Sequence, residues 1–430
     1  MKTIRSFLGN LILPNTRHVS IYTQGLSMKR TFLQKYFSGL TKNSLLLAFA
    51  SLFSDISTEM LYPILPVYLT KYLGANGSIV GIIEGIAQAT QNIIQGFSGW
   101  LSDKFQKRKP IALVGYFLSA ASKPFIGLAN TWKIVLAARF SDRLGAGGRA
   151  APRDALIAES VKPEHRGKAF GLEGIGDNFG AFLGPLITLL LFFSLRVDIH
   201  SIFYLAIIPG LVAFLMILLV KEKRALTSAK SKIDLHIRQF PKVYWKYLLV
   251  TCLFGLGNSS NAFLILLISE KGLSLQNTVL VYSFYNLAAA LISYPAGTLS
   301  DKFGRKPLLL ISFIIFFICY TGFAFSLNFF LVIFLFMFYG LFQGIFRATG
   351  KSYASDFVPQ YLRASGIGWY STVVGLSGLI ASIVAGQLWD KVNHASVFIY
   401  GAVLSLTGII FLIMLVPNSL HKNESLRKAG

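Results

Sequence analysis

The sequence contains twelve apolar stretches, each long enough to cross a lipid bilayer as an α-helix. A bilayer core of about 30 Å needs about 20 helical residues, and this chain is 54% hydrophobic but only 14% charged. The expected spans cover residues 44–70, 78–100, 111–129, 132–151, 169–193, 200–220, 246–269, 276–300, 308–327, 329–350, 366–389 and 395–416. These stretches predict an all-α membrane protein.

The two halves of the chain repeat each other. The string GWLSDKF begins at Gly99 and GTLSDKF at Gly297, an offset of 198, and the RAAPR string at Arg149 corresponds to RATGK at Arg347 with the same offset. Parallel repeats of six helices enclose a cavity at their interface near the bilayer midplane. We therefore expect two pseudo-symmetric bundles, residues 44–220 and 246–416, flanked by a basic N-terminal segment (1–43), a basic linker (221–245) and a tail (417–430).

The net charge of +23 is unevenly distributed. Lys and Arg concentrate in the tails and in the loops on one side, which follows the positive-inside rule and argues against nucleic acid as a partner. The expected topology is multi-pass in the inner (plasma) membrane with both termini cytoplasmic, and the linker faces anionic headgroups. The apolar piece 7–13 is too short for a signal peptide, so no cleavage is expected; Met28 is an alternative start.

The repeated loop resembles the signature of the major facilitator superfamily of secondary transporters, and the resemblance extends over residues 44–416. Gly297 to Lys306 fits the pattern throughout, whereas Gln106 occupies a glycine position of the first copy, so that turn either adopts another conformation or carries one extra residue. The resemblance implies the fold just described and a cytoplasmic latch made by Gly99, Asp103, Arg108, Gly297, Asp301, Gly304 and Arg305. The alternative is that these charges only anchor loops and fix topology.

Ionisable residues inside the expected spans gather in the first half. A charge at a helix centre costs about 2.5 to 3.5 kcal/mol and is usually functional. Apart from Lys133 and Lys246 at span ends, six acids face four bases there, including Lys123 and Arg149, while Arg347 is the one base within the second half's spans. We expect a carboxylate and arginine cluster from spans one, four and five, with static pairing as the alternative. The proton-coupling or substrate candidates are Asp55, Glu59, Glu84, Arg139, Asp142, Arg143, Glu173 and Asp177.

The span 169–193 resembles the antiporter motif of the drug:proton branch of the superfamily. Gly171, Gly180, Gly184 and Pro185 match its spacing, and Pro63 and Pro66 match a Pro-x-x-Pro of that branch. Arg139 stands where the branch has an arginine implicated in proton transfer, although Asp142 and Arg143 depart from its pattern. The resemblance favours antiport over symport.

Polar uncharged residues in the second half suit an organic solute with a few hydrogen-bonding sites. The expected cavity wall consists of Asn258, Asn261, Tyr285, Asn286, Gln343 and Tyr370. The six histidines have no metal-ligand spacing, and no nucleophile elbow or phosphate loop occurs, so neither a metal nor a cofactor nor an enzyme is expected.

The expected function is transport of a small organic solute by alternating access, driven by the proton gradient, most readily as an efflux antiporter. A proton symporter importing a nutrient or siderophore-like solute is the alternative. A non-transporting sensor or scaffold on the same fold is the alternative of another class. The expected partners are the solute, protons and membrane lipid, and the expected state is a monomer.

Overall fold

The structure, a computed structural model, describes residues 39–105, 107–162, 165–222, 240–325, 328–359 and 363–417. Most of the expected N-terminal segment, linker and tail lies outside these residues. The described residues contain helices and no strands, and the helices follow the twelve expected spans in order.

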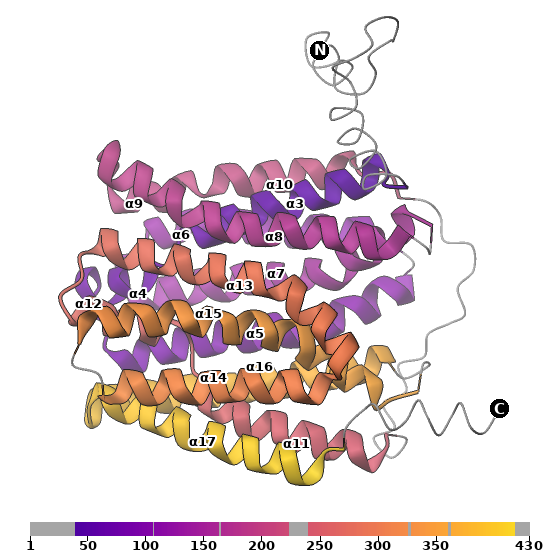
Figure 1. Cartoon of the computed structure of the whole chain (residues 1–430). Helices are drawn as coiled ribbons and strands as arrows, with labels where there is room; N and C mark the ends of the chain where they lie inside the picture. Colours follow the sequence, from indigo (N-terminus) through magenta and orange to yellow (C-terminus); the bar gives the residue numbers. More distant parts are fainter. Residues whose placement is uncertain are drawn as a thin grey trace, which may run out of the picture. The chain divides into compact units, whose positions relative to one another are not determined.

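The first half consists of α3 (Lys42–Glu59), the short α4 (Leu65–Val67) with a π-helical turn (Tyr68–Tyr72), α5 (Gly77–Phe105), α6 (Arg108–Gly127), α7 (Trp132–Ser160), α8 (Arg166–Leu189) with a second π-helical turn (Leu190–Ser194), α9 (Ile199–Leu205) and α10 (Ile207–Leu219). The second half consists of α11 (Lys242–Gly257), α12 (Ala262–Glu270), α13 (Leu275–Phe303), α14 (Arg305–Phe325), α15 (Phe329–Asp356), α16 (Arg363–Lys391) and α17 (His394–Leu415). Figure 1 shows them in sequence colours.

Packing follows the internal repeat. In the first half α3 packs on α8, α6 on α7 and α10 on α6, and in the second α11 packs on α16, α14 on α15 and α17 on α14. Two helix pairs make most of the contact between the halves, α5 with α16 and α8 with α13 (Figure 1). Each pair is the repeat counterpart of the other, so the halves meet across a pseudo-two-fold axis, as parallel repeats do.

Eight of the described helical segments are long and apolar enough to cross a membrane by length and composition alone. The crossings not among them are made by α3, α5, α6 and α7, all in the first half. Helix α7 alone carries Arg139, Asp142, Arg143 and Arg149. The polar character of these helices results from ionisable residues that must be buried against protein or line water.

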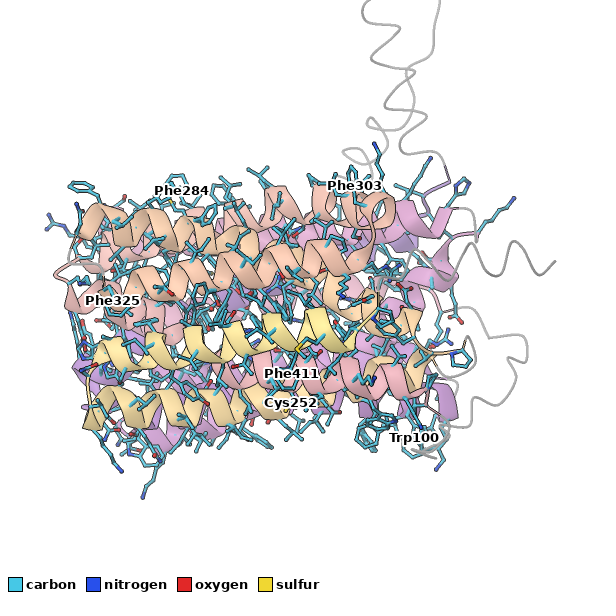
Figure 2. All side chains as sticks on the ribbon, turned by 60° about the horizontal axis from the view of Figure 1, so that its bottom comes forward. Trp100, Cys252, Phe284, Phe303, Phe325 and Phe411 are labelled. Atoms are coloured by element: carbon cyan, nitrogen blue, oxygen red, sulfur yellow. The ribbon has the colours of Figure 1, made fainter. Side chains whose placement is uncertain are left out.

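The outer surface of the described helices is apolar. Phe284, Phe303 and Phe325 are 46%, 53% and 70% exposed and project from the helices (Figure 2). An exposed apolar surface of this extent marks contact with lipid or a partner, and together with the spans it defines an integral multi-pass membrane protein.

Three of the expected spans differ clearly from the structure. The span expected at 44–70 is interrupted between Glu59 and Leu65. Helix α7 continues past Pro152 to Ser160, nine residues beyond the expected end, so Arg153 and Asp154 lie on a helix. The span expected at 246–269 is interrupted: α11 ends at Gly257, Asn258 to Asn261 are not helical, and α12 begins at Ala262. Asn and Ser side chains compete for backbone hydrogen bonds, which favours such a break.

Candidate functional site: two ionic networks beside a polar cavity

The first cluster of ionisable residues, here named the Arg139 network, joins α5, α6 and α7. The Arg139 guanidinium donates to Glu84 Oε1 from Nη2 at 2.7 Å and from Nε at 3.1 Å. Arg139 Nη1 also lies 3.3 Å from Asp142 Oδ2. Arg139, Glu84 and Asp142 are 3%, 5% and 2% exposed, so this pairing occurs almost without water.

Three cations surround Asp142. Besides Arg139, Lys123 Nζ lies 3.6 Å from Oδ1 and Arg143 Nε lies 3.4 Å from Oδ2. Ser119 donates to Oδ1 at 2.6 Å. Because every charge of this network has a partner of opposite sign, its first effect is to hold α5, α6 and α7 together.

The second cluster, here named the Arg153 network, joins α3, α7 and α8. Arg153 Nη2 lies 2.7 Å from Glu173 Oε1 and 3.0 Å from Asp154 Oδ1, and Nη1 lies 3.6 Å from Asp177 Oδ1. Ser51 accepts from Arg153 Nη1 at 2.8 Å and donates to Glu173 at 3.1 Å. Three carboxylates therefore share one guanidinium, and Asp177 is 34% exposed.

Asp55 and Arg149 lie near this network, and neither has an ion-pair partner among the residues that the structure describes. Asp55 on α3 packs on α8, where a Cβ added to Gly180 would come 2.9 Å from the Asp55 Cβ, and it makes no hydrogen bond or ion pair with any described residue. Arg149 is 7% exposed and stacks over the Tyr116 ring at 4.5 Å. Its Nε and Nη1 have no hydrogen-bond partner among the described residues, and the two residues lie within electrostatic reach of each other.

The single cluster expected from spans one, four and five is divided between these networks. Arg143 contacts Asp142 and donates to Gln91 on α5 at 2.9 Å, whereas Arg153 binds Glu173 and Asp177. Ten residues separate the two arginines, which is about 15 Å along a helix and a rotation of about 80°. Arg143 therefore faces α5, and Arg153, which the sequence analysis did not select, binds the carboxylates of α8.

Glu59 connects the first half with the second. Tyr282 on α13 donates to Glu59 Oε2 at 2.9 Å, and the rings of Tyr62 and Tyr282 stack at 5.5 Å. The Tyr62 hydroxyl lies 3.3 Å from Ser260 Oγ. Tyr62 and Ser260 are 198 residues apart, so the interruptions that follow α3 and α11 are repeat counterparts that touch each other.

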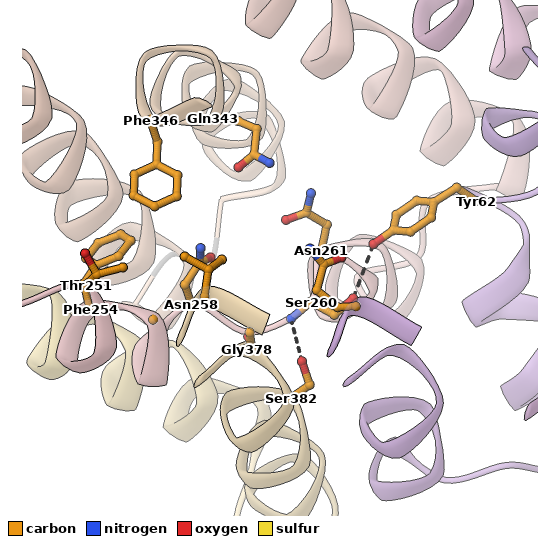
Figure 3. Close-up of a pocket in the computed structure, with 14 residues that line it drawn as sticks. Tyr62, Thr251, Phe254, Asn258, Ser260, Asn261, Gln343, Phe346, Gly378 and Ser382 are labelled. Atoms are coloured by element: carbon orange, nitrogen blue, oxygen red, sulfur yellow. Dashed lines mark hydrogen bonds between the residues drawn. The ribbon is translucent and has the colours of Figure 1, made fainter. Parts of the chain in front are cut away.

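A polar cavity of about 110 Å³ lies at this contact (Figure 3). Its wall combines amides, hydroxyls and aromatic rings from both halves and contains Tyr62, Gln88, Thr251, Phe254, Gly255, Asn258, Ser259, Ser260, Asn261, Gln343, Phe346, Val374, Gly378 and Ser382. Three expected wall residues, Asn258, Asn261 and Gln343, are among them. A non-helical backbone at membrane depth is tolerated where it lines such a cavity.

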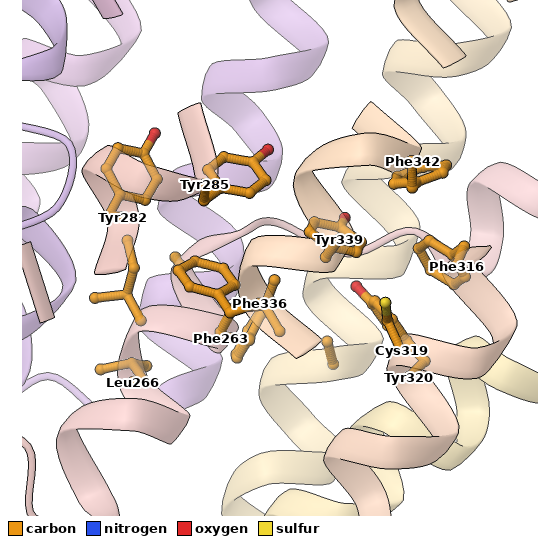
Figure 4. Packing of buried hydrophobic residues seen from close by; sticks show 14 of the residues in the cluster. Phe263, Leu266, Tyr282, Tyr285, Phe316, Cys319, Tyr320, Phe336, Tyr339 and Phe342 are labelled. Atoms are coloured by element: carbon orange, nitrogen blue, oxygen red, sulfur yellow. The ribbon is translucent and has the colours of Figure 1, made fainter. Parts of the chain in front are cut away.

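The other three expected wall residues lie outside this lining. Tyr285 accepts from Asn261 Nδ2 at 2.9 Å and stacks on Phe336 at 5.1 Å, within the aromatic core of the second half (Figure 4). Asn286 donates to the Ala181 carbonyl on α8 at 3.2 Å. Tyr370 stacks on Tyr247 at 6.1 Å. Tyr285 thus supports Asn261, and Asn286 joins the halves.

The repeated loop fixes helices within each half. Arg108 pairs with Glu159 on α7, and Arg305 Nε lies 3.1 Å from Asp356 Oδ2 on α15. Both arginines and both acids are related by 197 residues, one fewer than Gly99 and Gly297, so the first loop carries one extra residue. Gly304 has φ +93°, a conformation that favours glycine. The Asp103 and Asp301 side chains lie outside the described part of the structure.

The helix glycines expected from the antiporter motif divide into two groups. A Cβ on Gly180 or Gly184 would meet α3 at under 3 Å, whereas nothing lies within 4 Å of one on Gly171. Gly180 and Gly184 therefore bring α8 onto α3 within the first half, and Pro185 follows inside α8.

Asp390, in the last turn of α16 and not among the site residues expected from the sequence, joins the halves. Its Oδ1 accepts from Gly77 N at 2.8 Å, and its Oδ2 accepts from Ser78 N at 2.7 Å and from Ser78 Oγ at 2.5 Å. The carboxylate of α16 thus caps the N-terminus of α5, where backbone N–H groups and the helix dipole favour a negative charge. We call this contact the Asp390 clasp.

Two packed six-helix repeats, with buried ionisable residues and a polar cavity where the repeats meet, define a secondary transporter of the membrane. The chain belongs to the Major Facilitator Superfamily, whose sequence profile matches residues 47–284 and 247–430. This is a family of transporters rather than enzymes.

The chain is 35% identical over 382 residues to an uncharacterised MFS-type transporter of Methanocaldococcus jannaschii, covering 87% of this chain and 95% of that protein. It is 26% identical over 370 residues to the quinolone resistance protein NorA of Staphylococcus aureus, covering 83% and 92%. A D-xylose-proton symporter has a similar structure, with TM-score 0.72, 17% identity and coverage of 88% and 98%. The nucleoside transporter NupG has TM-score 0.71, 14% identity and coverage of 87% and 99%. At these identities the two structures establish the fold alone.

Proposed function

We propose that this chain exports a small organic solute in exchange for protons, by alternating access. The Arg153 network carries the proposal, because three carboxylates share one guanidinium there and Asp55 lies beside it without a hydrogen-bond or ion-pair partner in the described helices. Carboxylates in excess of cations inside a membrane protein are the groups that take up and release protons. Protons exchanged on Asp55, Glu173 and Asp177 supply the driving force, and no cofactor is needed.

Glu59 links the proposed proton-binding carboxylates with the polar cavity proposed for the solute. It follows Asp55 by one helical turn on α3 and accepts a hydrogen bond from Tyr282, which stacks on Tyr62 of the polar cavity. Protonation of Glu59 removes the negative charge that accepts the Tyr282 hydrogen bond. Solute binding and protonation therefore act on the same contact between the halves.

Alternating access requires contacts between the halves that exist in one state only. The Asp390 clasp is such a contact. We propose that the end of the bundle that contains it faces outward and that both termini face the cytoplasm of a cell whose inner, or plasma, membrane holds the protein, since Lys and Arg concentrate on the other side. The clasp then closes the outer entrance, and the latch loops lie at the cytoplasmic entrance.

The similarity to NorA, which is named as a quinolone resistance protein, favours export over import. The spacing of Gly180, Gly184 and Pro185, with two of them packed on α3, agrees with an antiporter. We propose that the protein works as a monomer whose partners are the solute, protons and the surrounding lipid, without nucleic acid.

Growth of cells that produce the chain tests the direction of transport. A strain without its own drug exporters is grown with a panel of toxic organic compounds, with the chain or its Asp55→Asn variant. Export predicts raised tolerance to at least one compound and loss of that tolerance in the variant. Lowered tolerance identifies an importer, and unchanged growth across the panel identifies the non-transporting alternative; both results contradict the proposal.

A further inference from the structure

Arg347 lies in the C-terminal half of α15 and is not among the proton-binding groups proposed above. It follows Gln343 by four residues, so the two side chains share one face of the helix, and Gln343 lines the polar cavity. The Arg347 side chain is exposed and makes no hydrogen bond or ion pair with any described residue. A spanning helix thus carries an uncompensated positive charge one turn from the cavity.

The surroundings of Arg347 place it at the interface between the halves. It lies within electrostatic reach of Glu59 on α3 and of Tyr285 on α13. Its repeat counterpart, Arg149, is only 7% exposed and packs against the Tyr116 ring. The repeat thus keeps an arginine at both positions, but only the second-half copy is open to the space between the halves.

An arginine that faces hydrocarbon without a partner is costly, so Arg residues within spanning helices face water-filled space or a counter-ion. Glu59 does not neutralise Arg347 directly, because no ion pair joins them and the Glu59 carboxylate accepts from Tyr282. The free guanidinium can therefore bind an anion that enters between the halves.

We propose that Arg347 binds the carboxylate of the transported solute, and that the solute is an organic acid with an apolar or aromatic body. This inference rests on the transport function proposed above. A guanidinium holds a carboxylate with two parallel hydrogen bonds. The Phe346 ring offers an aromatic surface for the body, and Asn258 and Gln343 offer amides for its polar atoms.

Equilibrium binding to the purified, detergent-solubilised chain tests the proposal. The probes are 2-naphthoate and benzoate, each compared with its neutral amide, and binding is followed by the increase in melting temperature over a concentration series. The acids are expected to stabilise the wild-type chain at concentrations where the amides do not. Arg347→Gln is expected to weaken acid binding by roughly ten- to hundredfold, as loss of a charged hydrogen bond does, and Arg347→Lys by less.

Lys133→Gln is the matched control, since it removes one exposed positive charge from α7 outside the cavity lining. It should bind the acids as the wild type does. Equal stabilisation by acid and amide, unchanged acid binding in Arg347→Gln, or no response of the wild type to either acid would each overturn the proposal. Because binding is measured without a membrane or a gradient, failed proton coupling leaves this result intact, and failed acid binding leaves the coupling test intact.

Discussion

At the scale of single residues, the buried pair of Glu84 and Arg139 has a structural role that can be separated from transport. Both side chains are almost fully buried and joined at 2.7 Å. Removing one partner of such a pair leaves a buried charge and costs about 3 to 5 kcal/mol, whereas replacing both costs far less.

Thermal unfolding of purified variants measures this difference. Arg139→Met is expected to lower the stability by about that 3 to 5 kcal/mol, and the double variant Glu84→Gln with Arg139→Met should recover much of the loss. If the double variant is less stable than Arg139→Met alone, the cost of Arg139→Met does not come from leaving the buried Glu84 carboxylate unpaired.

The sequence predicted some residues of the site and missed others. The location of the ionisable residues in the first half was predictable, because their number and position are visible in the sequence. Their pairing was not, since it depends on how far α7 rotates and extends. Arg153 was passed over because the fourth span was expected to end at residue 151, yet α7 continues past Pro152 to Ser160. The Asp390 clasp joins residues that are 312 positions apart in the sequence. No local sequence pattern could predict such a contact.

At the scale of helices, close contact between α3 and α8 depends on glycine. A Cβ at Gly180 would come 2.5 Å from the Leu52 carbonyl oxygen and 2.9 Å from Asp55 Cβ, so the helices must separate to accept it. Gly180→Ala is therefore expected to lower the melting temperature and to reduce transport, because Asp55 moves with α3.

Gly171→Ala provides the matched control on the same helix. Nothing lies within 4 Å of its added Cβ, and alanine is the better helix former by about 1 kcal/mol. Its melting temperature should equal or exceed that of the wild type. If both substitutions destabilise equally, the contact with α3 is not the reason for glycine at Gly180.

The helix breaks were only partly predictable. Pro63 and Pro66 mark the interruption after α3, and α4 begins at Leu65. The Asn258 to Asn261 stretch was recognised as polar but expected to be helical. Its break becomes stable only in the packed structure, where Ser260 N donates to Ser382 Oγ at 3.1 Å and Tyr339 donates to Asn261 Oδ1 at 3.3 Å.

At the scale of the whole described bundle, the Asp390 clasp is expected to control the balance between two conformations. Asp390→Ala removes three hydrogen bonds between the halves, and hydrogen bonds to a charged group contribute about 1.5 to 3 kcal/mol each. The end of the bundle that carries the clasp should therefore open more often in this variant.

Spin labels at Lys71 and Lys391, exposed residues of opposite halves at that end, allow the opening to be measured as a distance distribution. The variant should increase the population of the longer distance. Asp198→Asn changes a carboxylate at the same end that bonds within its own half, to His200, and should leave the distribution as in the wild type. An unchanged distribution in Asp390→Ala would mean that the clasp does not govern opening.

The twelve-span fold and its two-fold repeat were predictable because hydropathy and the repeated loop recur along the whole chain. The interiors of the two halves differ: ionisable residues pair inside the first, while aromatic rings pack inside the second (Figure 4). In the proposed function, protons are handled beside α3 and α8, and the solute binds in the cavity lined by α5, α11, α15 and α16.

Proton movement in proteoliposomes shows whether the chain exchanges protons for its solute. The chain is reconstituted with a pH-sensitive dye inside, a compound identified by the growth panel is added, and the wild type is compared with Asp55→Asn, Asp177→Asn and the control Asp198→Asn. Proton flux opposite to the compound is expected in the wild type and in the control. This proton flux should be lost in Asp55→Asn and Asp177→Asn while the protein remains folded. Compound transport without proton flux, or unchanged flux in both carboxylate variants, would contradict this exchange.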